Sequence, residues 1–273
     1  MGRRIVMIRL TKELTFCIPV RIDSEHRQRN LMGMLNFYSH NLRKAKYLIL
    51  EADSKPHIDE SRFCNKMLKP YLEYCFVKDD NPIFHRTRYI NQMLRQANTK
   101  VAAVWDTDAI APPMQVIDAY RAILRGETTM AYPYDGRFWA VNDFFSRRFC
   151  EAYKDELLYL TNYPQPLSLM CGYYSVGGAF LVDINKYRHC GWENEHFAGW
   201  GPEDAERYRR MELLGHKPLR ISGSLYHLYH PRGINSGDYN HHLALSTKKE
   251  YCRICGMQPD ELRREVAQWE WIK

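Results

Sequence analysis

The sequence has no long hydrophobic run, no low-complexity segment and no internal repeat. Its first residues contain only four apolar side chains in a row before Arg9 interrupts them, which is too few for a signal sequence or a membrane span. No stretch rich in glycine and serine, in proline or in charge of one sign marks a linker between domains. We therefore expect a cytoplasmic protein without a transmembrane segment, folded as one domain over residues 1–273.

Cysteine patterns typical of zinc sites are also missing. Of the eight cysteines, only Cys252 and Cys255 form a C-x-x-C pair, and no second pair completes a zinc site. We expect the cysteines to be reduced thiols. The net charge of +7 arises from basic residues scattered among acidic ones, which favours a solvated basic surface over a nucleic-acid site.

Short apolar runs that alternate with amphipathic stretches indicate an α/β protein. Hydrophobic residues make up 45% of the chain and charged residues 26%, as in ordinary globular domains. The apolar runs predict strands at Leu14–Val20, Tyr47–Leu50, Val101–Trp105, Thr129–Tyr132, Gly178–Asp183 and Leu219–Leu228. Helical periodicity predicts helices at Ser24–Ser39, Arg86–Gln96, Pro113–Arg125, Asn142–Leu160 and Pro202–Leu214, with Ser24 as an N-cap. We expect a mostly parallel, Rossmann-like central sheet flanked by helices.

Polar residues follow three of the predicted strands. Arg21 comes after the first, Asp106 and Asp108 after the third, and His227 and His230 at the end of the last. Ligands of open α/β sheets bind at the carboxyl ends of the strands. If these strands are parallel neighbours, an arginine, two carboxylates and two imidazoles converge at one edge of the sheet.

Asp106 and Asp108 form an Asp-x-Asp motif directly after an apolar strand. Two carboxylates one residue apart can face one ligand where the strand turns, and their oxygens suit Mg²⁺ or Mn²⁺. The same motif also occurs in ordinary turns, where both side chains bond to the local backbone. The motif alone leaves both interpretations open.

A second motif, Gly-Trp-Gly-Pro-Glu-Asp, occupies residues 199–204 before a predicted helix. Glycine and proline followed by acidic residues are common at helix starts, but this does not explain Trp200 between two glycines. The alternative is a substrate site in which Trp200 offers a flat apolar face to a sugar ring. Glu203 or Asp204, ionised at the helix N-terminus, could then act as a general base toward an alcohol.

His227 and His230 form a third motif. Histidines three residues apart can ligate one metal ion if the backbone turns between them, and Pro231 makes a turn plausible. A single histidine is more often a core or surface residue without a ligand. For the pair, both interpretations stay open: ligation of a metal ion, or a structural role without a ligand.

In their order and spacing, these motifs resemble the β-1,4-galactosyltransferase family and its bacterial relatives, which share a C-terminal galactosyltransferase domain on a GT-A fold. The matching blocks span roughly residues 14–232. Pro19 and Arg21 are similar to a Pro-Phe-Arg segment that contacts the nucleotide near its diphosphate. Phe84 and Arg86 resemble a Phe-Asn-Arg segment that holds the uridine.

The resemblance assigns further roles to the Asp-x-Asp motif and to the block at residues 199–204. Asp106 and Asp108 match an Asp-Val-Asp segment whose second aspartate binds the metal, which places Asp106 beside the nucleotide. The later block matches Gly-Trp-Gly-Gly-Glu-Asp. This match implies a catalytic base at Asp204, donor-sugar contacts at Glu203 and acceptor packing at Trp200.

The remaining matches concern the acceptor region and the metal. Gly178 belongs to a Gly-Gly segment that precedes the acceptor region in the family. His227 and His230 align with a Met-x-x-His metal pair. Two departures are visible: Pro202 replaces a glycine beside the catalytic carboxylate, and His227 replaces a methionine.

The resemblance implies a metal-dependent, inverting glycosyltransferase of polysaccharide biosynthesis. It would move galactose or N-acetylgalactosamine from a UDP-sugar to a hydroxyl of a glycan or glycoconjugate, with Mn²⁺ or another divalent cation as cofactor. It also implies a nucleotide-binding half at residues 1–110, an acceptor and catalytic half at 111–240 and a C-terminal helical tail at 241–273. The alternatives are a retaining enzyme similar to polypeptide N-acetylgalactosaminyltransferases and a non-catalytic module that binds nucleotide sugars.

Overall fold

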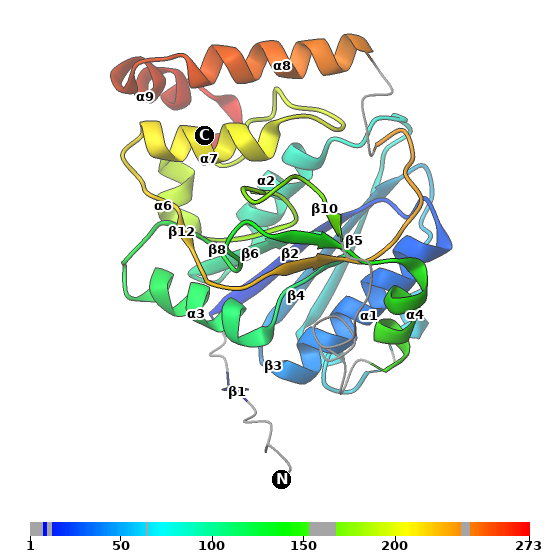
Figure 1. The fold of residues 1–273 in the computed structure, drawn as a ribbon. Coiled ribbons are helices and arrows are strands. Elements are labelled where there is room, and N and C mark those ends of the chain that lie inside the picture. Colours follow the sequence, from blue (N-terminus) through cyan, green and yellow to red (C-terminus); the bar gives the residue numbers. More distant parts are fainter. Residues whose placement is uncertain (1–7, 10–12, 64, 153–167, 236–240) are drawn as a thin grey trace.

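The computed structural model describes residues 8–9, 13–63, 65–152, 168–235 and 241–273. Its centre is a seven-stranded sheet (Figure 1). In spatial order the strands are β12 (Leu219–Arg220), β8 (Met130–Tyr132), β11 (Ala179–Asp183), β6 (Val101–Trp105), β2 (Leu14–Val20), β4 (Lys46–Asp53) and β5 (Leu72–Lys78).

The predicted α/β class and mostly parallel sheet are confirmed. Neighbouring strands run parallel except at β11, which is antiparallel to both β6 and β8. Every residue of β2 is buried, as expected for a central parallel strand covered on both faces. The order β6-β2-β4 brings the residues that follow β2 and β6 to the same edge of the sheet.

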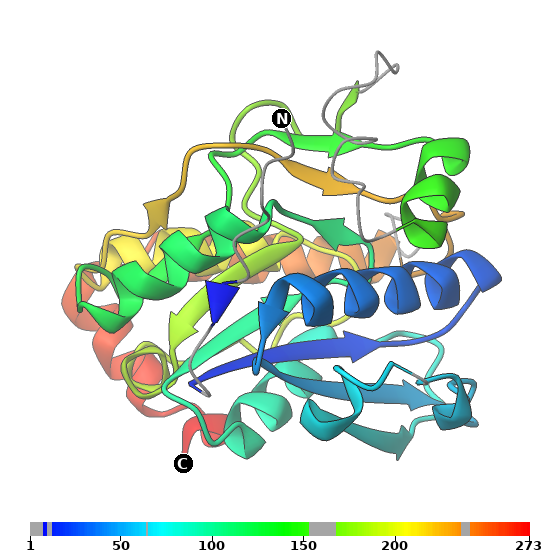
Figure 2. The same cartoon turned by 90° about the horizontal axis from the view of Figure 1, so that it is seen from below.

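Helices follow most of the strands. They are α1 (Glu25–Asn41), α2 (Arg86–Gln96), α3 (Pro113–Leu124), α4 (Asp143–Glu151), α6 (Ile184–His189), α7 (Glu203–Leu213), α8 (His241–Cys255) and α9 (Pro259–Ala267), with short 3-10 turns at Glu60–Arg62, Lys69–Tyr71 and Glu270–Ile272. Ser24 is the N-cap of α1, as predicted, and its side chain accepts a hydrogen bond from the amide of Arg27. Seen from below, α1 and α3 lie on one side of the sheet (Figure 2).

A second, four-stranded sheet corrects one prediction. It consists of β10 (Ser168–Leu169), β9 (Phe138–Ala140), β13 (Leu225–His227) and β7 (Ala109–Ile110). A separate two-stranded sheet pairs β1 (Ile8–Arg9) with β3 (Leu42–Arg43). The single strand predicted at Leu219–Leu228 is wrong, because β12 belongs to the main sheet and β13 to the second one. Gly223 separates them with φ of +122°, a conformation that side chains rarely allow.

The other differences follow from weak local patterns. β5 was not predicted, although it contains an apolar run at residues 74–77; it is an edge strand, and none of its side chains is fully buried. The short helix α6 was also missed. Of the helix predicted at Asn142–Leu160, α4 ends at Glu151, and residues 153–167 lie outside the described residues.

The C-terminal helices pack against α7. Figure 1 shows α8 above α7, and the two helices are in contact. Ile254, Leu262, Val266 and Trp269 form a small apolar cluster of their own. In the described part of the chain no helix is long and apolar enough to cross a membrane, and the seven described cysteines are free thiols.

Candidate functional site

One cavity of about 650 Å³ opens beside the carboxyl ends of β2 and β6. All the site residues predicted from the sequence line it: Pro19, Arg21, Phe84, Arg86, Asp106, Asp108, Gly178, Trp200, Glu203, Asp204, His227 and His230. Residues from both sheets and from the start of α7 therefore meet around a single space. Their chemical roles depend on the geometry within it.

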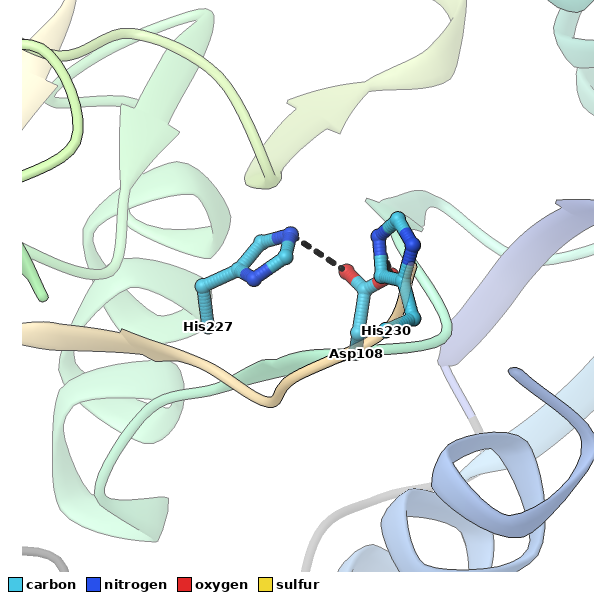
Figure 3. A group of neighbouring side chains, drawn as sticks. All are labelled: Asp108, His227 and His230. Carbon is cyan, nitrogen blue, oxygen red and sulfur yellow. Dashed lines mark ion pairs between the residues drawn. The ribbon is translucent and has the colours of Figure 1, made fainter. Parts of the chain in front are cut away.

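Asp108, His227 and His230 form a compact cluster whose side chains point toward one another (Figure 3). The carboxylate Oδ1 of Asp108 lies 3.6 Å from Nε2 of His227, and Oδ2 lies 3.2 Å from Nε2 of His230. The potential ligand atoms are all within 4.8 Å of one another. Two imidazoles and a carboxylate form a mixed nitrogen and oxygen set that fits Mn²⁺ or a related divalent cation.

Backbone pairing in the second sheet brings this cluster together. β7 and β13 are antiparallel, with His227 opposite Ala109, and the amide of Leu228 donates to the carbonyl oxygen of Asp108 at 2.8 Å. The sequence predicted the histidines at the end of a main-sheet strand. In the structure the strand that leads to them belongs to the second sheet. His227 is the last residue of β13 and His230 follows it, and β13 pairs with β7, the strand that starts directly after Asp108.

The electrostatics of the cluster favour an ionised carboxylate. Burial alone would raise the pKa of Asp108, but the neighbouring His227, His230 and Arg27 hold that pKa well below its usual range. Burial lowers the pKa of His227, which favours the neutral imidazole that metal binding requires. Burial also acts to lower the pKa of His230, but the hydrogen bond to Asp108 outweighs it and raises that pKa.

Arg27 is a site residue that the sequence did not reveal. Its Nη1 lies 3.3 Å from Oδ2 of Asp108, and its Nη2 lies 3.3 Å from Nδ1 of His230. A third bond, from Nε to Asp23 at 3.0 Å, orients the guanidinium. The available signal was its position in the first turn of α1, three residues after the N-cap Ser24 and next to the end of β2.

Asp106 pairs with Arg86 rather than with the metal cluster. Nη2 of Arg86 donates to Oδ1 of Asp106 at 2.7 Å, and Nε donates to the same oxygen at 3.2 Å. Burial raises the pKa of Asp106 although Arg86 acts in the opposite direction. The two aspartates of the motif thus have separate side-chain partners on different helices, α2 and α1. Their side chains therefore bond to arginines on neighbouring helices, in contrast to an ordinary Asp-x-Asp turn, where they bond to the local backbone.

Arg21 and Phe84 form the wall on the side of β4. Arg21 donates to the carbonyl oxygens of Ala52 at 2.8 Å and Asn81 at 2.7 Å, and its guanidinium lies 5.5 Å from the centre of the Phe84 ring. These bonds fix the arginine against protein oxygens. Its contact with a diphosphate therefore stays a prediction, while its packing against Phe84 is explicit.

Glu203 and Asp204 stand at the start of α7. Asp204 is partly exposed, and its Oδ1 accepts a hydrogen bond from Nη2 of Arg207 at 2.6 Å. Glu203 is buried, and its Oε2 has no hydrogen-bond partner among the described residues. Burial, together with the charge of Asp204, raises the pKa of Glu203 to about 8. Glu203 can therefore carry a proton at neutral pH and donate a hydrogen bond.

Two exposed aromatic rings border the cavity. Trp200 is 45% exposed, and Tyr174, which the sequence did not single out, is 85% exposed. Tyr174 lies in an irregular segment between β10 and β11, where no periodicity marks it. Exposed aromatic faces of this kind suit the apolar faces of sugar rings.

Comparisons with known proteins identify the fold. No protein-family model matches the chain. Human β-1,4-galactosyltransferase 7 is 32% identical over 91 residues, which are 32% of this chain and 25% of the human protein. The match therefore spans a quarter of that relative's length.

Two solved structures are similar over most of the chain. Residues 1–349 of S. aureus TarS in complex with UDP-GlcNAc have a TM-score of 0.55 at 11% identity, with 84% of this chain and 62% of that one covered. The mannosyltransferase PcManGT from Pyrobaculum calidifontis, in complex with GDP-Man and Mn²⁺, has a TM-score of 0.55 at 13% identity, with 93% and 68% covered. The chain therefore has the GT-A fold of glycosyltransferases, as its sequence predicted.

Proposed function

We propose that this protein is a metal-dependent, inverting glycosyltransferase that moves a hexose from a UDP-sugar to a hydroxyl of a glycan acceptor. The observation that carries the proposal is the shared cavity: the cluster of Asp108, His227 and His230 and the carboxylate of Asp204 line the same space. A diphosphate site and a proton acceptor within one cavity are what such a transfer requires.

The donor nucleotide would lie along the wall formed by Phe84 and Arg86. The ring of Phe84 offers a stacking face for the uracil. The buried Nη1 of Arg86 has no hydrogen-bond partner among the described residues and lies 4.0 Å from Oδ1 of Asp204. A divalent cation, when bound by Asp108, His227 and His230, supplies Lewis-acid neutralisation of the diphosphate. Arg86 adds fixed positive charge beside it.

The transfer step follows from the position of Asp204. The acceptor oxygen forms a bond to the anomeric carbon, and the bond from that carbon to the diphosphate oxygen breaks with its electron pair leaving on UDP. The acceptor proton passes to the carboxylate of Asp204. Attack opposite the leaving group inverts the anomeric configuration. Glu203, carrying a proton, would donate a hydrogen bond to a hydroxyl of the donor sugar.

Galactose or N-acetylgalactosamine is our proposed donor sugar, because the human relative is a galactosyltransferase. The structural neighbours bind UDP-GlcNAc and GDP-Man, so these donors belong in the same assay. On the acceptor side, Trp200 and Tyr174 provide two exposed rings for a carbohydrate. A glycan acceptor is therefore proposed rather than a small alcohol.

The decisive experiment is nucleotide release from a panel of nucleotide sugars with Mn²⁺ and mixed glycan acceptors, compared between the wild type and Asp204→Asn. We expect the variant to lose about 10² to 10⁴-fold in kcat, the usual contribution of a general base. Its affinity for UDP, measured by calorimetry, should stay close to that of the wild type. Loss of UDP binding in parallel with activity would make Asp204 a donor residue instead of the base.

Two further results would redirect the proposal. Tight binding of a UDP-sugar without any nucleotide release would identify a non-catalytic binding module. A product with the anomeric configuration of the donor, observed by NMR, would identify a retaining transferase.

A further inference from the structure

A buried ion pair lies directly behind Asp204. Nε and Nη2 of Arg207 donate to the two carboxylate oxygens of Glu193 at 2.8 and 2.9 Å. The side chain of Arg207 is fully buried and that of Glu193 is 2% exposed. The pair is therefore bidentate and removed from water, the strongest geometry for such an interaction.

Both members of this pair are held by further contacts. Glu193 accepts a hydrogen bond from the hydroxyl of Tyr187 at 2.6 Å, and its backbone exchanges two bonds of 2.9 Å with the amide side chain of Asn91. The guanidinium of Arg207 lies 4.0 Å from the centre of the Phe180 ring. These contacts tie the pair to β11, α6 and α2, so its position is set by the core.

Arg207 connects this fixed ion pair to Asp204. Its Nη2 donates to Oδ1 of Asp204 at 2.6 Å, one helical turn away on α7. On the other side the backbone of Gly177 is so close that a Cβ atom there would lie 2.7 Å from Oδ2. The carboxylate of Asp204 is therefore fixed between a rigid donor and a wall of the cavity.

A buried ion pair is weak evidence for a contribution to stability. Removing two charges from water is costly, and apolar side chains of similar volume often stabilise a core as well or better. A bidentate arginine that also donates to a cavity carboxylate has a second effect, because it determines where that carboxylate points.

We propose that Glu193 and Arg207 are positioning residues that set the orientation of the Asp204 carboxylate toward the acceptor hydroxyl. The inference rests on the proposed function, in which Asp204 is the base. Neither residue lines the cavity. Their action therefore goes through Asp204, and they should influence kcat rather than donor binding.

The chain contains a matched control on the same helix. Arg210 and Glu206 also form a fully buried pair, with Nε of Arg210 and Oε1 of Glu206 at 2.7 Å. Arg210 contacts the carbonyl oxygens of Cys190 and Trp192 rather than Asp204. Disruption of this pair removes comparable core interactions without touching the proposed base.

The test compares the double variant Glu193→Gln/Arg207→Met with Glu206→Gln/Arg210→Met, because neither double variant leaves one charge buried alone. We expect the first to lower kcat by about 10²-fold, the effect of misplacing a reactive group by about 1 Å. The KM for the donor and the affinity for UDP should change little. The control should lose stability but keep the kcat of its folded fraction near that of the wild type.

Tyr187→Phe keeps the inference testable if the double variant does not fold. It removes only the hydrogen bond to Glu193, and we expect a smaller fall in kcat of about 5-fold with unchanged UDP affinity. If the Glu193/Arg207 variant behaves like the control while Asp204→Asn abolishes transfer, the positioning role is wrong and the proposed function stands. If Asp204→Asn remains active, both are wrong.

Discussion

Arg27 and a cation bound at the cluster would compete for the carboxylate of Asp108. The guanidinium donates to Oδ2 of Asp108, the same oxygen that lies 3.2 Å from His230. A cation bound at Asp108 must share this carboxylate with the positive charge of Arg27. When a diphosphate is also present, the guanidinium gains a second anionic partner, so Arg27 favours nucleotide and metal together over metal alone.

Arg27→Ala should therefore have opposite effects on the two ligands. We expect the affinity for UDP in the presence of Mn²⁺ to fall about 10-fold or more, as for loss of a hydrogen bond to a charged group. Affinity for Mn²⁺ alone should rise. Calorimetric titrations measure both values. Arg147→Ala is the control, since this exposed arginine pairs with Asp143 and does not line the cavity. Equal UDP affinities for both variants would show that Arg27 is not a diphosphate ligand.

Glu203 introduces a pH dependence of stability. Its pKa is raised from 4.5 to about 8, chiefly by burial, so the folded protein keeps a proton at intermediate pH that the unfolded chain releases. Stability therefore falls as pH rises from about 4.5 to about 8, and this decrease is complete above the folded pKa.

Replacement of Glu203 by glutamine should remove this dependence. We expect Glu203→Gln to resemble the wild type in urea unfolding at about pH 5 and to be more stable at about pH 9, where the wild type must bury a charge. Glu212→Gln, an exposed position on the same helix, is the control. A difference between wild type and Glu203→Gln that is the same at both pH values would contradict a proton on Glu203.

At the scale of elements, the turn between β12 and β13 takes the chain from the main sheet to the second sheet, where the histidines lie. Gly223 adopts φ of +122°, and a Cβ atom there would lie 2.2 Å from Oε1 of Gln115. Gln115 in turn donates to the carbonyl oxygen of Ser224 at 3.1 Å, next to the start of β13. The turn is therefore constrained both by its backbone angle and by its packing.

Gly223→Ala should destabilise the protein by about 2 to 4 kcal/mol, from left-handed backbone strain and the clash with Gln115. Gly215→Ala isolates the backbone part, because Gly215 has φ of +87° with open space around it, and should cost about 1 kcal/mol. Urea unfolding gives both values, and Mn²⁺ affinity should fall only in the first variant. Equal destabilisation of the two variants would show that the clash with Gln115 is relieved at little cost.

At the scale of the whole molecule, ligand binding joins regions that are distant in the sequence. The cavity is lined by residues from the end of β2, from α2, from the start of α7 and from the second sheet. A ligand that contacts all of them binds only the folded chain, so it must raise the temperature of unfolding.

We expect saturating UDP with Mn²⁺ to raise the unfolding midpoint by roughly 5 °C, as for a ligand at about one hundred times its Kd. Asp108→Asn should lose the part of this shift that depends on Mn²⁺, while UDP with a chelator should give the same smaller shift in both proteins. Differential scanning fluorimetry is sufficient for the comparison. A full shift in the variant would exclude Asp108 as a metal ligand.

The sequence predicted which residues line the cavity better than the path by which they meet. Asp106 and Asp108 follow a strand that is apolar throughout, and this pattern can be recognised within a few neighbouring residues. The pairing of β7 with β13 is not readable, because strands of two and three residues carry no periodicity. Arg27 was missed for a related reason: an arginine in the first turn of a helix is common, and only the tertiary structure places it beside Asp108.

Because β7 pairs with β13, the candidate metal site depends on the number of residues between Gly223 and His227. Successive side chains of a strand point to opposite faces, so His227 faces Asp108 only in the present register with Ala109. Insertion of one residue between Gly223 and His227 would turn the imidazole to the opposite face, although every ligand would still be present in the sequence. Insertion of two residues would restore its direction but displace it by about 7 Å. Among relatives that bind metal in this way, the number of residues in this segment should therefore be as constrained as the identity of the ligands.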